Sequence, residues 1–173
     1  MPQNIEIKAR TGNIASVGKR LTSLGARYEV TLHQHDTFFH VPSGRLKLRR
    51  FQDRQAELLF YHRPDESGPT RSEYRRLPLD DPDYYQELLS AAFGTRGVVE
   101  KTRHLYHLGQ TRIHLDTVNH LGEFVELEVV LDLTQTMQDG HTIAKDLMES
   151  LGIRKNELVD AAYIDLLEQI RSP

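Results

Sequence analysis

The 173-residue sequence contains no cysteine and no long apolar run. Without cysteine, the chain can form neither disulfides nor thiolate metal sites. It also has no Walker-type glycine loop and no Gly-x-Ser-x-Gly elbow, the motifs of many nucleotide-binding proteins and hydrolases. No segment is apolar enough to span a membrane, and Met1-Pro2-Gln3 leads directly into the first expected strand. We therefore expect a cytoplasmic protein without a membrane partner.

The charge balance argues against a further class of partner. The formal net charge is -3 at pH 7, so we expect no nucleic-acid partner. A hydrophobic content of 38% is typical of a globular chain, and this length is sufficient to bury a core. Because the sequence has no repeat, low-complexity tract or long linker, we predict one domain spanning residues 1–173.

Alternation of charged and apolar residues predicts strands with one charged face. The clearest example is the segment 45–49, in which arginine and lysine alternate with leucine. The full pattern predicts strands at 4–10, 27–40, 45–49, 57–63, 70–77, 98–107, 111–118 and 123–131, and helices at about 14–24, 82–93, 138–151 and 157–170. The short connections favour antiparallel pairing, which indicates an α+β fold with a large antiparallel sheet that is closed or nearly closed.

The cationic strand faces need compensation. Seven side chains recur on these faces: Lys8, Lys47, Arg49, Arg71, Arg75, Lys101 and Arg103. Because like charges on neighbouring strands repel, either acidic side chains or a bound polyanion must neutralise them. Arginine and lysine are the usual ligands of phosphate groups, so we favour an anion site over a purely structural ion network.

The acidic residues suggest a metal beside that anion. Glu6 lies on the first expected strand, Asp116 on the seventh, and Glu126 and Glu128 share a face of the last. Carboxylates of this kind hold Mg²⁺ or Mn²⁺, whose remaining positions are taken by phosphate oxygens and water. This chemistry favours phosphoryl or nucleotidyl transfer. The pair His33-x-His35 has no third ligand at zinc spacing, so we interpret it as surface or packing histidines.

Several motifs, taken in order, resemble the CYTH superfamily of triphosphate tunnel enzymes, which includes class IV adenylyl cyclases and thiamine triphosphatases. The matching segments cover nearly the whole chain and are 5–8, 44–49, 61–64, 71–73, 101–103, 115–118 and 121–128. The opening Ile-Glu-Ile-Lys is most similar to the cyclase-type branch. The resemblance implies a closed eight-stranded antiparallel β-barrel, or tunnel, with a charged interior and helices packed outside. It also implies a homodimer.

The resemblance further implies roles for individual residues. Phosphate binding is carried over to Lys8, Lys47, Arg49, Arg71, Lys101 and Arg103, with Lys8, Arg49 and Arg103 acting in catalysis. Metal binding is carried over to Glu6, Asp116, Glu126 and Glu128. Two positions depart from the family pattern. Asn4 replaces the first glutamate of Glu-x-Glu-x-Lys, and His62, followed by Arg63, replaces a lysine on the fourth strand. We expect these changes to alter metal affinity and the pH dependence of anion binding.

Three functions remain open from the sequence. The leading one is a cyclase-like enzyme that converts ATP to cyclic AMP and pyrophosphate with Mg²⁺ or Mn²⁺. The second is a triphosphatase acting on a nucleoside, thiamine or inorganic triphosphate. The third is a non-catalytic binder of organic polyphosphates.

Overall fold

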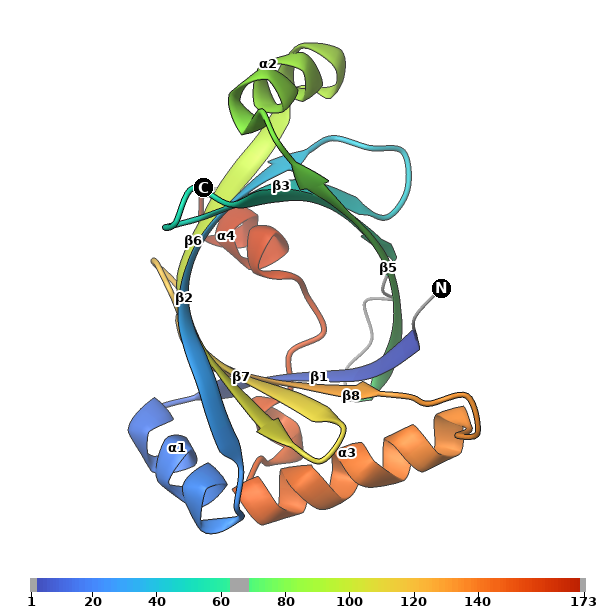
Figure 1. Ribbon diagram of the computed structural model, residues 1–173. Helices are drawn as coiled ribbons and strands as arrows, with labels where there is room; N and C mark the ends of the chain where they lie inside the picture. Colours follow the sequence, from blue (N-terminus) through green and yellow to red (C-terminus); the bar gives the residue numbers. More distant parts are fainter. Residues whose placement is uncertain (1–2, 63–68, 172–173) are drawn as a thin grey trace.

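The computed structural model describes residues 3–62 and 69–171, and its centre is a closed antiparallel barrel (Figure 1). The elements run in the order β1 (Gln3–Thr11), α1 (Ile14–Ser23), β2 (Arg27–Phe39), β3 (Arg45–Phe51), β4 (Ala56–His62), β5 (Thr70–Leu79), α2 (Pro82–Phe93), β6 (Thr95–Leu108), β7 (Thr111–Val118), β8 (Gly122–Val130), α3 (Met137–Leu151), a 3₁₀ turn (Lys155–Glu157) and α4 (Tyr163–Arg171). Around the barrel the strands follow the order β1-β5-β4-β3-β2-β6-β7-β8, and β8 pairs with β1. The predicted fold class is confirmed. Arg63 and residues 64–68 of the following loop lie outside the described residues.

The apolar face of each strand in one sector points outward and is covered by helices. Ile5 and Ile7 on β1 and Leu127 on β8 are fully buried beneath α1 and α3. Figure 1 places these two helices together on the β1, β7 and β8 side of the barrel. The main hydrophobic core therefore lies outside the barrel, which leaves the charged strand faces to point inward.

Helix α4 closes one end of the barrel. Its Tyr163, Ile164 and Leu167 pack with Phe38 and Phe124, which stand on β2 and β8. In Figure 1, α4 lies within the outline of the strand ring, whereas α1, α2 and α3 lie outside it. The apolar side chains of α4 thus form a plug at one end of the interior.

The first three predicted helices are confirmed. Asn13 caps α1 by accepting a hydrogen bond from the Ser16 N–H, and Asp81 does the same for α2 from the Tyr84 N–H. Gly152 ends α3 in the left-handed conformation, at the position that the sequence predicts. No helix among residues 3–62 and 69–171 is long and apolar enough to cross a membrane.

The predicted final helix at 157–170 is wrong in its first half. The helix begins only at Tyr163, because the preceding segment is extended and pairs with β1. Leu158 forms a bridge with Ala9, and the Val159 N–H donates to the Lys8 carbonyl oxygen at 2.9 Å. This added pairing satisfies backbone groups that a helix would otherwise satisfy. It also brings Tyr163 to the end of the interior.

Strand β6 begins earlier than the sequence predicts. It starts at Thr95, and so includes Gly97, which lies just before the predicted strand at 98–107. A Cβ at Gly97 would lie 2.8 Å from Cδ1 of Ile164. Glycine at this position therefore permits the close approach of α4 to the barrel wall.

We predict that Gly44→Ala destabilises the turn into β3. Gly44 has φ +67°, and an added Cβ would lie 2.9 Å from both the Phe60 ring and the Tyr61 carbonyl oxygen. Backbone strain and this overlap should lower the free energy of unfolding by about 2 kcal/mol. Denaturant unfolding measures the change. The control is Gly12→Ala, since nothing lies within 4 Å of that Cβ; an equal loss in both variants would contradict the prediction.

Candidate functional site

The barrel encloses a cavity of about 440 Å³ that is lined by residues from all eight strands and from the segment leading into α4. Its lining is strongly ionic. The cationic side chains are Lys8, Arg45, Lys47, Arg49, Arg76, Lys101, Arg103 and Arg112, and the acidic ones are Glu6, Asp36, Glu57, Glu126 and Glu128. Cations therefore outnumber acids eight to five along the wall, a balance that suits an anionic ligand.

One cationic cluster is organised by Asp36 on β2. This carboxylate is 2% exposed and accepts hydrogen bonds from Arg49 Nε, Arg49 Nη2 and Lys47 Nζ, each at 2.7 Å. Burial alone would raise the pKa of Asp36, but the charges of Arg49 and Lys47 hold it well below its usual range. Asp36 is therefore ionised at neutral pH and fixes both cations against the wall.

The neighbouring lysines remain poorly compensated. Burial and the Arg49 charge lower the pKa of Lys47 to about 7, despite the contact with Asp36. Burial and the Arg103 charge lower the pKa of Lys101 to about 8. Each shift means that the protonated ammonium is destabilised in the free protein. An anion in the cavity would supply the missing counter-charge.

A second cluster is organised by Asp116 on β7. Arg103 donates to Asp116 at 2.7 and 2.6 Å and to Glu126 at 2.6 Å. Lys101 Nζ lies 3.3 Å from Asp116, and the Tyr163 hydroxyl donates to the same carboxylate at 3.0 Å. Burial raises the pKa of Asp116, but Arg103 and Lys101 lower it further, to about 2. Arg103 is therefore held in place by carboxylates on β7 and β8.

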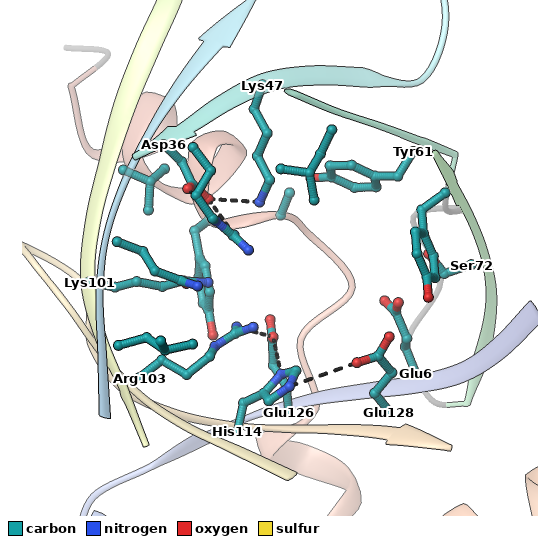
Figure 2. A pocket seen from close by; sticks show the side chains of 18 of the residues that line it. Glu6, Asp36, Lys47, Tyr61, Ser72, Lys101, Arg103, His114, Glu126 and Glu128 are labelled. Carbon is teal, nitrogen blue, oxygen red and sulfur yellow. Dashed lines mark hydrogen bonds and ion pairs between the residues drawn. The ribbon is translucent and has the colours of Figure 1, made fainter. Parts of the chain in front are cut away.

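Glutamates gather on the opposite part of the wall, where β1 meets β8. Glu6 and Glu128 are directly opposite in the register of these strands, and Figure 2 shows their carboxylates side by side. Arg112 donates to Glu128 at 2.9 and 2.7 Å, and Lys8 Nζ lies 3.4 Å from Glu126. Like charges in direct cross-strand contact are destabilising, so this pair favours a bound cation.

His114 lies between the cationic and acidic parts of the wall. Its Nδ1 is 3.4 Å from Glu126 and its Nε2 is 3.8 Å from Glu128, as the dashed lines in Figure 2 indicate. Burial and the Arg103 charge lower the pKa of His114, although Glu126 opposes the shift. The imidazole is therefore neutral at pH 7 and adds no positive charge to the cavity.

The donor set fits a divalent cation that also binds a ligand. Among the described residues, no three His, Asp or Glu side chains are grouped so as to hold a metal ion by themselves. Mg²⁺ and Mn²⁺ commonly take one or two carboxylates and complete their coordination with phosphate oxygens and water. Glu6 and Glu128 offer such a pair. Beside them, the fully buried Asn4 donates from its amide nitrogen to Glu128, and its Oδ1 has no partner among the described residues.

Most of the sequence-predicted site residues meet at this cavity. Its lining includes Lys8, Lys47, Arg49, Lys101, Arg103, Glu6, Glu126 and Glu128. Asp116 is fully buried behind Arg103, where it orients that side chain rather than facing the cavity.

Arg71 and His62 lie on the outer face of the barrel. Arg71 is exposed and contacts Glu73, whereas the inward residues of β5 are Ser72, Tyr74 and Arg76. His62 is exposed at the end of β4, and its neighbour Tyr61 lines the cavity instead. The geometry therefore does not support the phosphate contacts expected of Arg71 and His62, because the residues that face the cavity are their neighbours Ser72 and Tyr61.

Several residues of the cavity wall were not predicted from the sequence. Asp36, Tyr61, Arg112, His114 and Tyr163 all contact or line the cavity. Period-two alternation could have found Asp36, which shares a strand face with Gln34 and Phe38, and Arg112 and His114, which share one with Asp116. Tyr163 carried no such signal, because its position depends on the extended segment before α4.

The sequence and the fold both match known proteins. The family model described as CYTH domain matches residues 2–163. The structure is similar to that of the PH1012 protein from Pyrococcus horikoshii, with 26% identity, a TM-score of 0.86, and coverage of 94% of this chain and 98% of that one. No curated protein matches the chain.

The descriptions of two further similar structures name an enzymatic activity. A candidate adenylate cyclase from Vibrio parahaemolyticus is 15% identical, with a TM-score of 0.79 and coverage of 95% of this chain and 97% of that one. A candidate adenylyl cyclase from Hippeastrum, described as having a dominant triphosphatase activity, is 16% identical, with a TM-score of 0.69 and coverage of 98% and 96%. At these identities the similarity establishes the shared fold.

We predict that Arg49 and Arg71 differ in their effect on anion binding. Arg49→Gln removes a buried cation from the cavity wall and should weaken binding of inorganic tripolyphosphate by at least about tenfold. Arg71→Gln alters the outer face and should change it by less than about twofold. Isothermal titration calorimetry measures both, with circular dichroism to verify folding. Equal losses would refute the placement of these two side chains.

We also predict that anion binding weakens as the pH rises above 7. Lys47 has a pKa of about 7 in the free protein, and a bound anion should return it toward the ordinary value of 10.5. Binding is then accompanied by proton uptake above pH 7, whereas below pH 7 Lys47 is already charged. Calorimetry in buffers of different ionisation enthalpy detects these protons. Lys47→Arg should reduce the uptake, and an unchanged uptake would contradict the assignment.

Proposed function

Because the chain belongs to the CYTH domain family, we propose that it is a metal-dependent enzyme that cleaves a phosphoanhydride bond of a triphosphate inside the barrel. The observation that carries this proposal is the excess of fixed cations in an enclosed cavity, beside an acidic pair suited to a divalent ion. A triphosphate with its metal ion complements both halves of that wall.

The cationic half accounts for binding and for stabilisation of the leaving group. Arg49 and Arg103 are held rigidly by Asp36 and Asp116, so their remaining N–H groups need little reorganisation to meet phosphate oxygens. Lys47 and Lys101 add two ammonium groups to the same wall. Preorganised donors of this kind stabilise negative charge that develops on the leaving phosphate.

The acidic half accounts for metal dependence. Glu6 and Glu128 would hold the ion, and Asn4 keeps Glu128 oriented through its amide nitrogen. When bound, the metal supplies Lewis-acid polarisation of a phosphoryl oxygen. Arg112 holds Glu128 from the other side, so the carboxylate is fixed before a ligand enters.

Two reactions use this arrangement. In the cyclase-like reaction the ribose 3′-oxygen of ATP attacks the α-phosphorus, which releases pyrophosphate and leaves cyclic AMP. In the hydrolytic reaction water attacks the terminal phosphorus and orthophosphate is released. The neighbours named above support one each, since one is described as a candidate cyclase and the other as having a dominant triphosphatase activity. Our leading assignment is the cyclase-like reaction, which the opening strand of the sequence also favours.

The products of the reaction test the proposal. We expect purified protein with Mg²⁺ or Mn²⁺ to cleave ATP, with cyclic AMP and pyrophosphate as products of the leading reaction. Orthophosphate would assign hydrolysis instead. Glu128→Gln should lower kcat about 100-fold and raise the metal concentration that gives half-maximal rate, because one carboxylate ligand is lost. Chromatography of the products and a metal titration measure these effects.

The matched control is Glu73→Gln on the outer face of β5, which should retain the wild-type rate. Tight binding of ATP and tripolyphosphate without any product would identify a non-catalytic polyphosphate binder and reject the enzyme. Equal activity of the two variants would reject the acidic pair as the metal site.

A further inference from the structure

His114 is a cavity residue that has no role in either of the two reactions. It stands on β7, is 8% exposed and lines the cavity. In the β7–β8 register it is directly opposite Glu126, and Glu128 lies two residues further along β8. Figure 2 connects its ring to both carboxylates. Such an imidazole can serve as a structural bridge or as a metal ligand, and its two nitrogens distinguish these roles.

The Nδ1 atom is held by a carboxylate. It lies 3.4 Å from Oε2 of Glu126 and donates its proton, because an ionised carboxylate can only accept. Arg103 donates to the same oxygen at 2.6 Å, and Lys8 Nζ lies 3.4 Å from the other oxygen, so both cations keep Glu126 ionised. The proton on Nδ1 leaves a lone pair on Nε2 of the neutral ring. A carboxylate that fixes one imidazole nitrogen in this way usually supports a metal ion on the other.

The Nε2 atom is directed toward Glu128. Its distance from Oε2 of this glutamate is 3.8 Å, which is too long for a hydrogen bond. With metal–ligand bonds of about 2.1 Å, two ligands of one ion lie about 3 Å apart when adjacent and about 4 Å apart when opposite. The observed separation lies between these limits. Arg112 Nε donates to the same oxygen at 2.9 Å, but a carboxylate oxygen has a second lone pair that can bind an ion.

A nitrogen ligand changes which ion the site prefers. Mg²⁺ takes oxygen ligands almost exclusively, whereas imidazole suits the divalent ions of the first transition row. In the part of the chain that the structure describes, no three His, Asp or Glu side chains are grouped to hold an ion alone. His114 and Glu128 therefore offer two ligands, and phosphate oxygens and water can complete the coordination. Glu6, opposite Glu128 on β1, adds negative charge beside them.

We propose that His114 Nε2 is a ligand of the divalent ion and makes the site selective for transition ions over Mg²⁺. Glu126 then acts through His114, as a positioning residue that orients the ring. This proposal rests on the proposed function and deepens it, since it names a further ligand of the same site and the class of ion that binds there.

Mn²⁺ bound to the purified protein tests the nitrogen ligand. Electron spin-echo envelope modulation detects the hyperfine coupling of Mn²⁺ to a coordinated imidazole nitrogen. We expect this coupling in the wild-type protein and its loss in His114→Gln, which keeps a donor for Glu126 but has no imidazole. The matched control is His33→Gln, an exposed histidine that contacts Thr102 on the outer face of the barrel. This control should keep the coupling.

Isothermal titration with Co²⁺ or Mg²⁺ alone measures the selectivity. His114→Gln should weaken Co²⁺ binding by about tenfold or more and Mg²⁺ binding by less than about twofold, because only Co²⁺ gains from the imidazole nitrogen. An equal loss for both ions would overturn the proposal.

The outcomes separate this inference from the proposed function. If the wild-type protein binds neither Mn²⁺ nor Mg²⁺, the metal-dependent reaction fails and the inference fails with it. If Mn²⁺ binds without nitrogen coupling, or if the coupling persists in His114→Gln or is lost in His33→Gln, the nitrogen ligand alone is overturned. Labelling wild-type protein with ¹⁵N-histidine should change the coupling, a measurement that holds even if His114→Gln fails to fold.

Discussion

The structure depends on the compensation of buried charge inside a closed barrel. Inward-facing arginines and lysines on adjacent strands repel one another, and each would be costly without a partner. Asp36 and Asp116 solve this locally, since each accepts hydrogen bonds or close contacts from two cations. The compensation is incomplete, as the lowered pKa values of Lys47 and Lys101 indicate. A bound polyanion can compensate the remaining positive charge, so stability and ligand preference have the same electrostatic origin.

Much of this arrangement follows from period-two alternation. The pattern placed Lys47 and Arg49 on one face of β3, and Glu126 and Glu128 on one face of β8, and the structure keeps each pair together. Which face turns inward is a separate question that alternation does not answer. In β4 and β5 both faces carry polar residues, so nothing in the local sequence distinguishes Tyr61 from His62 or Arg71 from Ser72. Their assignment depends on cross-strand register, to which distant residues contribute.

The segment before α4 illustrates a second kind of information that the sequence hides. Its composition is compatible with a helix, but pairing of Leu158 and Val159 with β1 overrides that preference. This pairing also affects the cavity, because it places Tyr163 against Lys8 and Lys101. The centroid of its ring lies 4.1 Å from the Lys8 ammonium nitrogen and 4.9 Å from that of Lys101. The pairing with β1 thus places α4 at the end of the barrel and sets the neutral ring of Tyr163 beside two cations.

The pairing of β1 with β8 determines when Glu6 and Glu128 can come together. Glu6 meets Glu128 only when β1 pairs with β8, the first strand of the chain with the last. During synthesis, Glu6 is therefore made long before Glu128, and this acidic pair cannot form until β8 is available. Such long-range closure is slow by topology. A ligand that contacts both strands binds the folded barrel and not the unfolded chain. It therefore raises the free energy of unfolding by mass action.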